Sequence, residues 1–142
     1  MAGESCYMTE TCSQGGCLCG AVRYEAQGMP IRVANCHCSM CRRHSGAAFL
    51  TYVGYPSDRV RFLKGRPAVY RSSDAAARGH CAAFGSPLTF VYHNDPETMW
   101  LTGGSFDDPT VAAPKEHWFV ADKLAWVQLD DHLPRWPGAP EG

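Results

Sequence analysis

The chain has 142 residues, of which 45% are hydrophobic and 19% charged, and its formal net charge is −1. This length and balance predict one globular domain with a buried core, and the near-neutral charge gives no general attraction to nucleic acid or to an anionic membrane. No apolar run approaches the roughly 18 residues of a membrane span, and the first residues lack a signal-peptide pattern, so a cytoplasmic location is expected.

The chain is expected to be mainly β. Its 14 glycines and 10 prolines are spread along the sequence, as in folds of many short strands joined by turns. Turn-forming residues at 64–67 and 93–97 predict two hairpins. Extended segments are expected at residues 21–26, 31–33, 48–53, 60–63, 68–71, 88–92, 98–102, 117–121 and 124–129.

Helix is expected in two short places only. Ser39 can cap a single helical turn through His44 that ends near Gly46. Residues 75–77 are three alanines, which favour a helix, and Gly79 would end it early.

The sequence shows no internal domain boundary. Residues 1–14 are small and polar and predict a flexible N-terminal arm. One domain is expected over residues 15–136, followed by a C-terminal tail at 137–142. The region after Asp130 is rich in proline and is expected to be irregular, as a plain arm or as a segment folded over the site.

Three cysteines, Cys36, Cys38 and Cys41, fall within six residues, and Arg42 and Arg43 follow at once. One tetrahedral metal ion can be reached by all three sulfurs, whereas a disulfide between the first two would close a small, strained ring. Catalytic zinc sites combine three protein ligands with one position for substrate, and structural sites close with four. The motif therefore predicts a metal open to substrate, with a structural zinc completed from elsewhere as the alternative.

A second C-x-C motif, Cys17 and Cys19, needs a partner, and Cys81 is the remaining cysteine in the body of the chain. Phe84 stands where a C-x₂-C motif would place its second cysteine. These residues predict a second metal site that is one ligand short, with a buried, metal-free Cys81 as the alternative. The candidates for its fourth ligand are water, His80 and Cys12.

The order of these motifs resembles the glutathione-dependent formaldehyde-activating enzyme family. The likeness rests on Gly15–Tyr24, Cys36–Arg42 and Cys81–Leu88, and extends to Gly103–Pro109 and Asp130–Trp136. Three ordered cysteine motifs are a specific signal, whereas a single C-x₂-C motif is not. The resemblance implies an Mss4-like fold of short antiparallel sheets with little helix and two zinc sites.

By this resemblance the structural zinc would be held by Cys17, Cys19 and Cys81. The family's fourth ligand falls on Phe84, which cannot bind zinc, so one or two zinc ions are expected in each chain.

By the same resemblance the catalytic zinc would be held by Cys36, Cys38 and Cys41. Family members are assigned the condensation of glutathione with formaldehyde to S-(hydroxymethyl)glutathione, formally a carbon–sulfur lyase acting in reverse. The expected partners are therefore a small thiol such as glutathione and a small aldehyde, with no nucleic acid and no membrane.

The residues around this motif suggest further roles. A thiol on zinc has its pKa lowered from about 8.5, so it stays a thiolate at neutral pH. Arg42 and Arg43 are candidates for the carboxylates of glutathione, and His44 for proton transfer. His37 lies between two ligands, so its ring is expected to point away from the metal. Core positions rather than ligand contacts are expected for Tyr52, Trp118 and Trp126.

Two alternatives remain from the sequence. One is a zinc-stabilised binding module without catalysis, since the Mss4-like fold also serves nucleotide-exchange and chaperone-like roles. The other is a family member that acts on a different thiol or aldehyde. Glutathione binding would separate the enzyme from the binding module, and rates with other thiols and aldehydes would separate the two enzymes.

Overall fold

The structure, a computed structural model, describes residues 11–140. It is mainly β, as the sequence predicts, and the described residues contain one α-helix, α1 (Ser39–Ser45). The strands form two sheets. The three-stranded sheet has the order β1 (Cys12–Gly16), β2 (Arg23–Gln27), β5 (Val60–Lys64). The seven-stranded sheet has the order β10 (Glu116–Trp118), β3 (Arg32–Cys36), β4 (Leu50–Pro56), β9 (Asp95–Thr102), β8 (Pro87–Tyr92), β7 (Ala76–His80), β6 (Ala68–Arg71).

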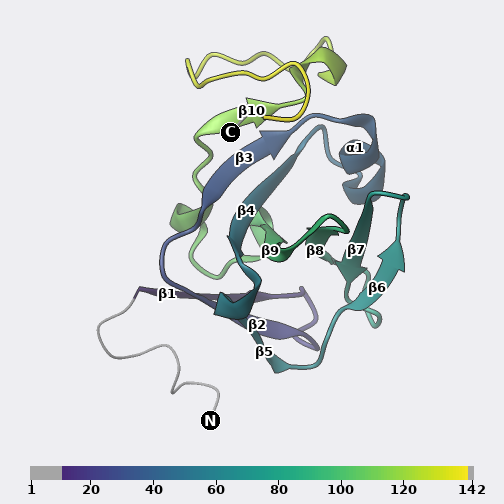
Figure 1. Cartoon of the computed structure of the whole chain (residues 1–142), viewed down its shortest axis with the longest axis vertical. Helices are drawn as coiled ribbons and strands as arrows, with labels where there is room; N and C mark the ends of the chain where they lie inside the picture. Colours follow the sequence, from purple (N-terminus) through teal and green to yellow (C-terminus); the bar gives the residue numbers. More distant parts are fainter. Residues whose placement is uncertain (1–10, 141–142) are drawn as a thin grey trace.

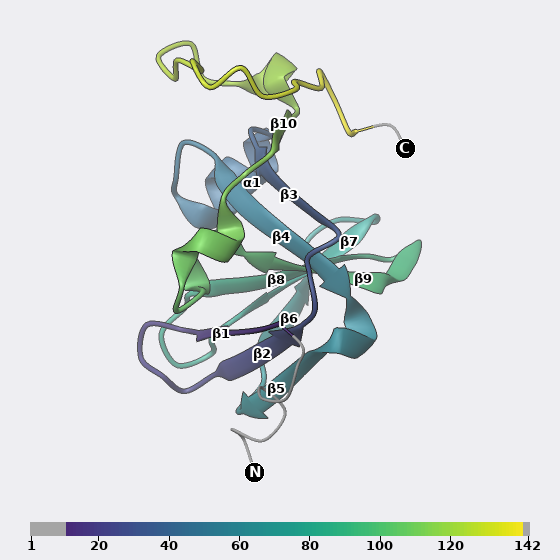
Figure 2. The ribbon, with the colours of Figure 1, turned by 90° about the vertical axis from the view of Figure 1, so that its left-hand side faces the viewer.

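Neighbouring strands of the larger sheet are antiparallel, except that β10 is parallel to β3. The three-stranded sheet lies at one end of the molecule, and the C-terminal segment lies at the other end, beyond β10 (Figures 1 and 2). Helix α1 follows β3 directly and lies toward the same end as β10 (Figure 1).

The two faces of the larger sheet bury different clusters, because successive side chains of a strand point to opposite faces. On β4, Val53 and Tyr55 belong to the core shared with the smaller sheet, whereas Tyr52 belongs to a second cluster. On β9, Leu101 and Trp100 divide in the same way. One face therefore builds the core, and the opposite face is available to build a site.

The core between the sheets is organised around Tyr24 of β2, which is fully buried. Its ring meets Phe106 edge to face, with 5.5 Å between the ring centres, and its hydroxyl lies 2.6 Å from the Ser105 hydroxyl. Burial of a side chain of this size stabilises the fold by about 1.5–3 kcal/mol. This core packs the smaller sheet against one face of the larger sheet.

The hairpin predicted at 93–97 is confirmed, because β8 pairs with β9. The hairpin predicted at 64–67 is wrong: β5 pairs with β2 in the smaller sheet, whereas β6 pairs with β7 in the larger one. Pro67 explains the difference, since the residue before a proline favours an extended conformation and the chain continues from one sheet to the other.

The helix predicted at residues 39–44 is confirmed as α1, and Gly46 ends it with a left-handed φ of 74°. The cap is Cys38 rather than Ser39, because the Cys38 sulfur accepts the backbone N–H of Cys41. The helix predicted at residues 75–77 is wrong, because that stretch leads into strand β7, which pairs on both sides.

The ends of the chain differ from the sequence prediction in detail. Residues 12–14, predicted to belong to the arm, begin strand β1, and residues 1–10 of that arm lie outside the described part. The strand predicted at 124–129 is wrong: Lys123 Nζ bonds the backbone oxygens of Leu124 and Val127 and closes a turn there. The irregular region after Asp130 is confirmed, and it packs beside β10 through backbone hydrogen bonds to His117.

Among the described residues, no helix has both the length and the apolar character that a membrane crossing requires.

Candidate metal centre and the adjoining cavity

Three sulfurs meet where β3 runs into α1. The Sγ atom of Cys41 lies 3.3 Å from that of Cys38 and 3.3 Å from that of Cys36. All three cysteines are free thiols, and their sulfurs lie close enough together to share one ion. Cys36 and Cys41 are buried and Cys38 is partly exposed. The three side chains are thus already gathered to hold a metal.

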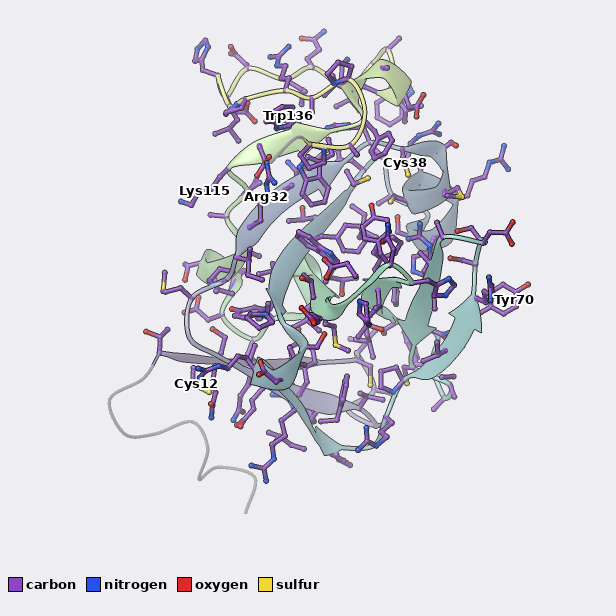
Figure 3. All side chains as sticks on the ribbon, in the orientation of Figure 1. Cys12, Arg32, Cys38, Tyr70, Lys115 and Trp136 are labelled. Carbon is purple, nitrogen blue, oxygen red and sulfur yellow. The ribbon has the colours of Figure 1, made fainter. Side chains whose placement is uncertain are left out.

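Local structure explains this convergence. Cys36 is the last residue of β3, where pairing with Leu50 of β4 fixes its backbone. Cys38 caps α1, which turns the chain so that Cys41 follows on the buried side of the helix. In Figure 3 the labelled Cys38 lies next to the helix, and sulfur atoms gather there.

Protonation also favours a metal at this centre. The hydrogen bonds that Cys38 shares with Cys36 and Cys41 lower the pKa of Cys38, and those that Cys36 shares with Cys38 and Cys41 raise the pKa of Cys36. One thiolate therefore forms at the expense of its neighbour. A bound cation removes this conflict, since the thiolate is the form that ligates metals. The donor set and its spacing fit a zinc-type ion, for which cysteine is a preferred ligand.

A buried arginine of β7 faces the sulfur of Cys41. Both terminal nitrogens of Arg78 lie 3.9 Å from Cys41 Sγ, and Nη1 donates to Tyr52 Oη at 2.7 Å. Arg78 is 5% exposed, and its guanidinium lies 4.7 Å from the ring centre of Phe90. Burial opposes its charge, but Tyr52 and Cys41 outweigh this effect and the pKa of Arg78 is raised. A permanent positive charge therefore stands beside the ligands.

A cavity of about 130 Å³ adjoins the three sulfurs. Most of its aromatic walls come from the face of the larger sheet opposite the core. Gly54 has no side chain, so the indole of Trp100 can lie against the backbone of β4. A Cβ atom at this position would clash with the indole. The aromatic side chains that line the cavity are Tyr52, Phe90, Tyr92, Trp100, Trp118 and Phe119. Tyr52 and Trp118, predicted to be core residues, are buried and also line this cavity.

Behind the ligands, His37 is fully buried and points away from the sulfurs. Its Nε2 lies 3.1 Å from Nδ1 of His117, and His117 Nε2 lies 2.8 Å from a carboxylate oxygen of Asp131. Burial is the main cause that lowers the pKa of His37, to about 4. The chain of three side chains fixes the loop between Cys36 and Cys38 from behind, as partners of ligand loops commonly do.

The C-terminal segment closes the end of the sheet beside this loop. Glu116 of β10 accepts Arg32 Nε at 2.6 Å and the indole N–H groups of Trp118 and Trp136 at 3.1 and 2.9 Å. Arg32 and Trp136 lie together beside β10 in Figure 3, and the guanidinium is 6.0 Å from the ring centre. Trp136 packs against the cluster that contains the ligands.

The other predicted site residues lie around α1. Arg42 and Arg43 line a separate hollow of about 300 Å³, which also includes Trp126 and lies outside the cavity described above. Trp126, predicted to lie in the core, is 72% exposed. His44 is half-buried, and its pKa is lowered, mainly by burial and next by the charge of Arg78.

The second group of cysteines also converges. Cys19 Sγ lies 3.4 Å from that of Cys17 and 3.6 Å from that of Cys81. Cys17 and Cys81 are buried, Cys19 is exposed, and Phe84 is 57% exposed. Among the described residues that group contains no fourth ligand, and neither His80 nor Cys12 belongs to it. The structure thus brings together two cysteine triads: the first triad, Cys36, Cys38 and Cys41, and the second triad, Cys17, Cys19 and Cys81.

Comparison with known proteins agrees with this arrangement. The model of the family described as glutathione-dependent formaldehyde-activating enzyme matches residues 12–122, which contain both triads. The chain belongs to this family. The match includes β1, so the family likeness begins before Gly15, and it ends before the C-terminal segment that packs beside β10.

One solved structure, a protein of Rhodobacter sphaeroides, has a similar fold. It matches with a TM-score of 0.55 and 21% identity, over 87% of this chain and 98% of the other. At this identity the likeness concerns the fold alone.

Sequence reasoning missed Arg78 and four of the aromatic residues of the cavity. The sequence did contain a pattern of period two. Ala76 and Arg78 lie two residues apart on β7, as do Phe90 and Tyr92 on β8, and all four line the cavity. Without the strand order these residues could not be assigned to one face.

Proposed function

We propose that this protein joins a small thiol to a small aldehyde at a zinc ion held by Cys36, Cys38 and Cys41. One arrangement supports the proposal: three free thiols converge at the edge of a cavity. Among the described residues that line this cavity, Arg78 carries the one permanent charge. The family description supplies glutathione and formaldehyde as the reference pair.

Zinc at this centre would supply Lewis acidity, which lowers the pKa of a thiol and keeps it ionised near neutral pH. The first triad would hold the ion as three thiolates. Arg78 would offset the excess negative charge of those ligands, since both of its terminal nitrogens face Cys41. The apolar walls of the cavity would exclude water from the reacting groups.

Tyr52 would serve the aldehyde. Its oxygen accepts an N–H of Arg78 at 2.7 Å, so its own proton is left for donation. Burial raises the pKa of Tyr52, so the hydroxyl stays protonated at neutral pH. Addition of sulfur to the carbonyl carbon places negative charge on the carbonyl oxygen, and a fixed hydroxyl donor would stabilise that charge.

The residues that follow the third ligand are proposed to serve the thiol. Arg42 and Arg43 would bind the carboxylates of glutathione from their hollow beside α1. His44 would accept the proton that the thiol loses, since its lowered pKa leaves the imidazole neutral at pH 7.

The test is the rate of adduct formation from glutathione and ¹³C-formaldehyde, measured by exchange NMR on zinc-loaded protein. The proposal predicts an acceleration proportional to protein concentration that Cys38→Ser removes. A zinc-loaded, folded protein that gives only the uncatalysed rate with every thiol and aldehyde tried would contradict it.

A zinc-stabilised binding module is the second candidate. The exposed side chains of Leu18 and Phe84 beside the second triad favour it, because exposed apolar groups at a metal loop can contact a partner protein. If the fully zinc-loaded protein does not bind glutathione, this candidate moves ahead of the enzyme.

A further inference from the structure

The cavity beside the first triad is larger than formaldehyde needs. Its volume is about 130 Å³. A water molecule occupies roughly 30 Å³ in the liquid, whereas an apolar cavity of about 150 Å³ takes up benzene. Formaldehyde has only two non-hydrogen atoms, so even beside the sulfur of a bound thiol it would leave much of this space empty. The volume instead suits a six-membered ring.

The walls also match a ring. Phe90 and Tyr92 stand at 89° with 4.7 Å between ring centres, and Trp100 and Trp118 stand at 83° with 5.0 Å between centres. Each pair presents both a face and an edge, which are the surfaces that attract a further aromatic ring. Tyr52 lies 5.5 Å from Phe90, so the proposed proton donor adjoins these walls.

The cavity provides little to bind a carboxylate. Among the described residues that line the cavity, Arg78 is the one with a permanent charge. Its terminal nitrogens face Cys41 and Tyr52, so its charge is directed at the ligands and not into the aromatic part of the cavity. The two carboxylates of glutathione would therefore lie outside the cavity, which leaves the cavity to the carbonyl partner.

We infer that the carbonyl partner of this site is an apolar, ring-sized aldehyde of the benzaldehyde class. This inference rests on the proposed function, because it names the aldehyde that the same site would use. In the reaction a carbon–sulfur bond forms, the carbon–oxygen double bond becomes single, and the thiol proton ends on the oxygen. The atoms balance without an oxidant or a reductant.

The first test measures binding without chemistry. Benzyl alcohol and methanol carry the same hydroxyl and differ by the ring, so their affinities for zinc-loaded protein can be compared by calorimetry or saturation-transfer NMR. We expect benzyl alcohol to bind at least tenfold more tightly. Equal affinities would overturn the inference.

Variants at and just before the start of β7 test whether the cavity causes the preference for benzyl alcohol. Ala76 is buried and lines the cavity, so Ala76→Leu fills part of it and should lower the preference for benzyl alcohol at least tenfold. Ala77 is the next residue on the same strand and does not line the cavity, so Ala77→Leu should keep the wild-type preference. If Ala76→Leu does not fold, Ala75→Phe, at an exposed lining position, takes its place.

The second test measures turnover of glutathione with benzaldehyde and with formaldehyde. We expect the ratio of the two catalysed rates, benzaldehyde over formaldehyde, to fall at least tenfold in Ala76→Leu. Catalysis with formaldehyde but no benzyl alcohol binding would overturn the inference and leave the proposed function intact. Ring binding without catalysis for any pair would overturn the proposed function, and with it the role of the ring as substrate.

Discussion

The two cysteine triads offer a metal the same three sulfurs but differ in what surrounds them. The first triad has a buried guanidinium facing Cys41, an aromatic cavity on one side and a chain of buried histidines behind it. The second triad includes the exposed Cys19 and has Phe84 where a fourth cysteine would complete the set. The two triads therefore differ in the space and the charge around their sulfurs, and the sulfurs alone do not distinguish them.

The largest expected effect separates the two triads by function. Cys38→Ser removes a ligand of the first triad and should lower the catalysed rate at least about 100-fold, since even residues behind metal ligands can cost 10–100-fold. Cys19→Ser removes a ligand of the second triad and should change that rate less than about threefold, provided the protein stays folded. Exchange NMR and zinc counts by native mass spectrometry check both variants. The reverse order of effects would exchange the roles of the two triads.

The next effect tests the charge that distinguishes the first triad. Arg78→Met keeps an apolar chain of similar length but removes the cation, so zinc affinity at the first triad should fall about 10–100-fold. Arg71→Met, at an exposed position of β6, is the matched control and should leave the affinity unchanged. Competition with a chelator measures both. Equal affinities in the two variants would show that Arg78 does not balance the ligand charge.

A third change should make the second triad more like a closed structural site. Phe84→Cys supplies the missing thiol and should raise zinc affinity there at least about tenfold and raise the melting temperature, because metal binding adds to folding free energy. Phe84→Ala removes the ring without adding a ligand and should do neither. If the cysteine variant behaves like the alanine variant, the second triad is completed by another group.

The smallest effect concerns the support that β10 gives to the first triad. Burial opposes the charge of Glu116, but hydrogen bonds from Arg32 and the two indoles outweigh it and lower its pKa. The carboxylate thus stabilises the fold above its unfolded pKa of about 4.3, and this stabilisation is lost as the pH falls through the lower folded value.

Glu116→Gln should therefore lower the free energy of unfolding by about 1–3 kcal/mol at pH 7. The difference between variant and wild type should shrink below about pH 4, where the wild-type carboxyl becomes protonated. Denaturant unfolding at several pH values measures it. A difference that stays constant down to pH 3 would mean that the charge of Glu116 contributes nothing.

The sequence predicts the first triad well, because its ligands lie within six residues and a local turn is enough to gather them. It does not predict Arg78, which lies 37 residues from Cys41 along the chain and reaches the sulfurs only through the order of β4, β9, β8 and β7. The failed hairpin at 64–67 has the same origin. Local turn chemistry cannot say that β5 and β6 belong to different sheets.

Helix propensity gives a wrong prediction where strand pairing determines the local structure. The alanines at 75–77 favour a helix by themselves, yet strand pairing on both sides of β7 places Ala76 and Arg78 on the cavity face. Period-two patterns succeed at β8 and β9, because the turn between them also favours a hairpin. The aromatic cavity is therefore a product of sheet order, although each of its residues is visible in the sequence.

The central claim is that a metal ion held by the first triad leaves one coordination position for a substrate thiol. Cobalt(II) in place of zinc reports this directly, since each thiolate that binds cobalt adds to the sulfur-to-metal absorption. We predict that glutathione raises this absorption in the wild type and in Cys19→Ser, to a limit of one equivalent in Cys19→Ser, and does not raise it at the first triad in Cys38→Ser. An increase that survives in Cys38→Ser and disappears in Cys19→Ser would place the thiol on the second triad and contradict the account.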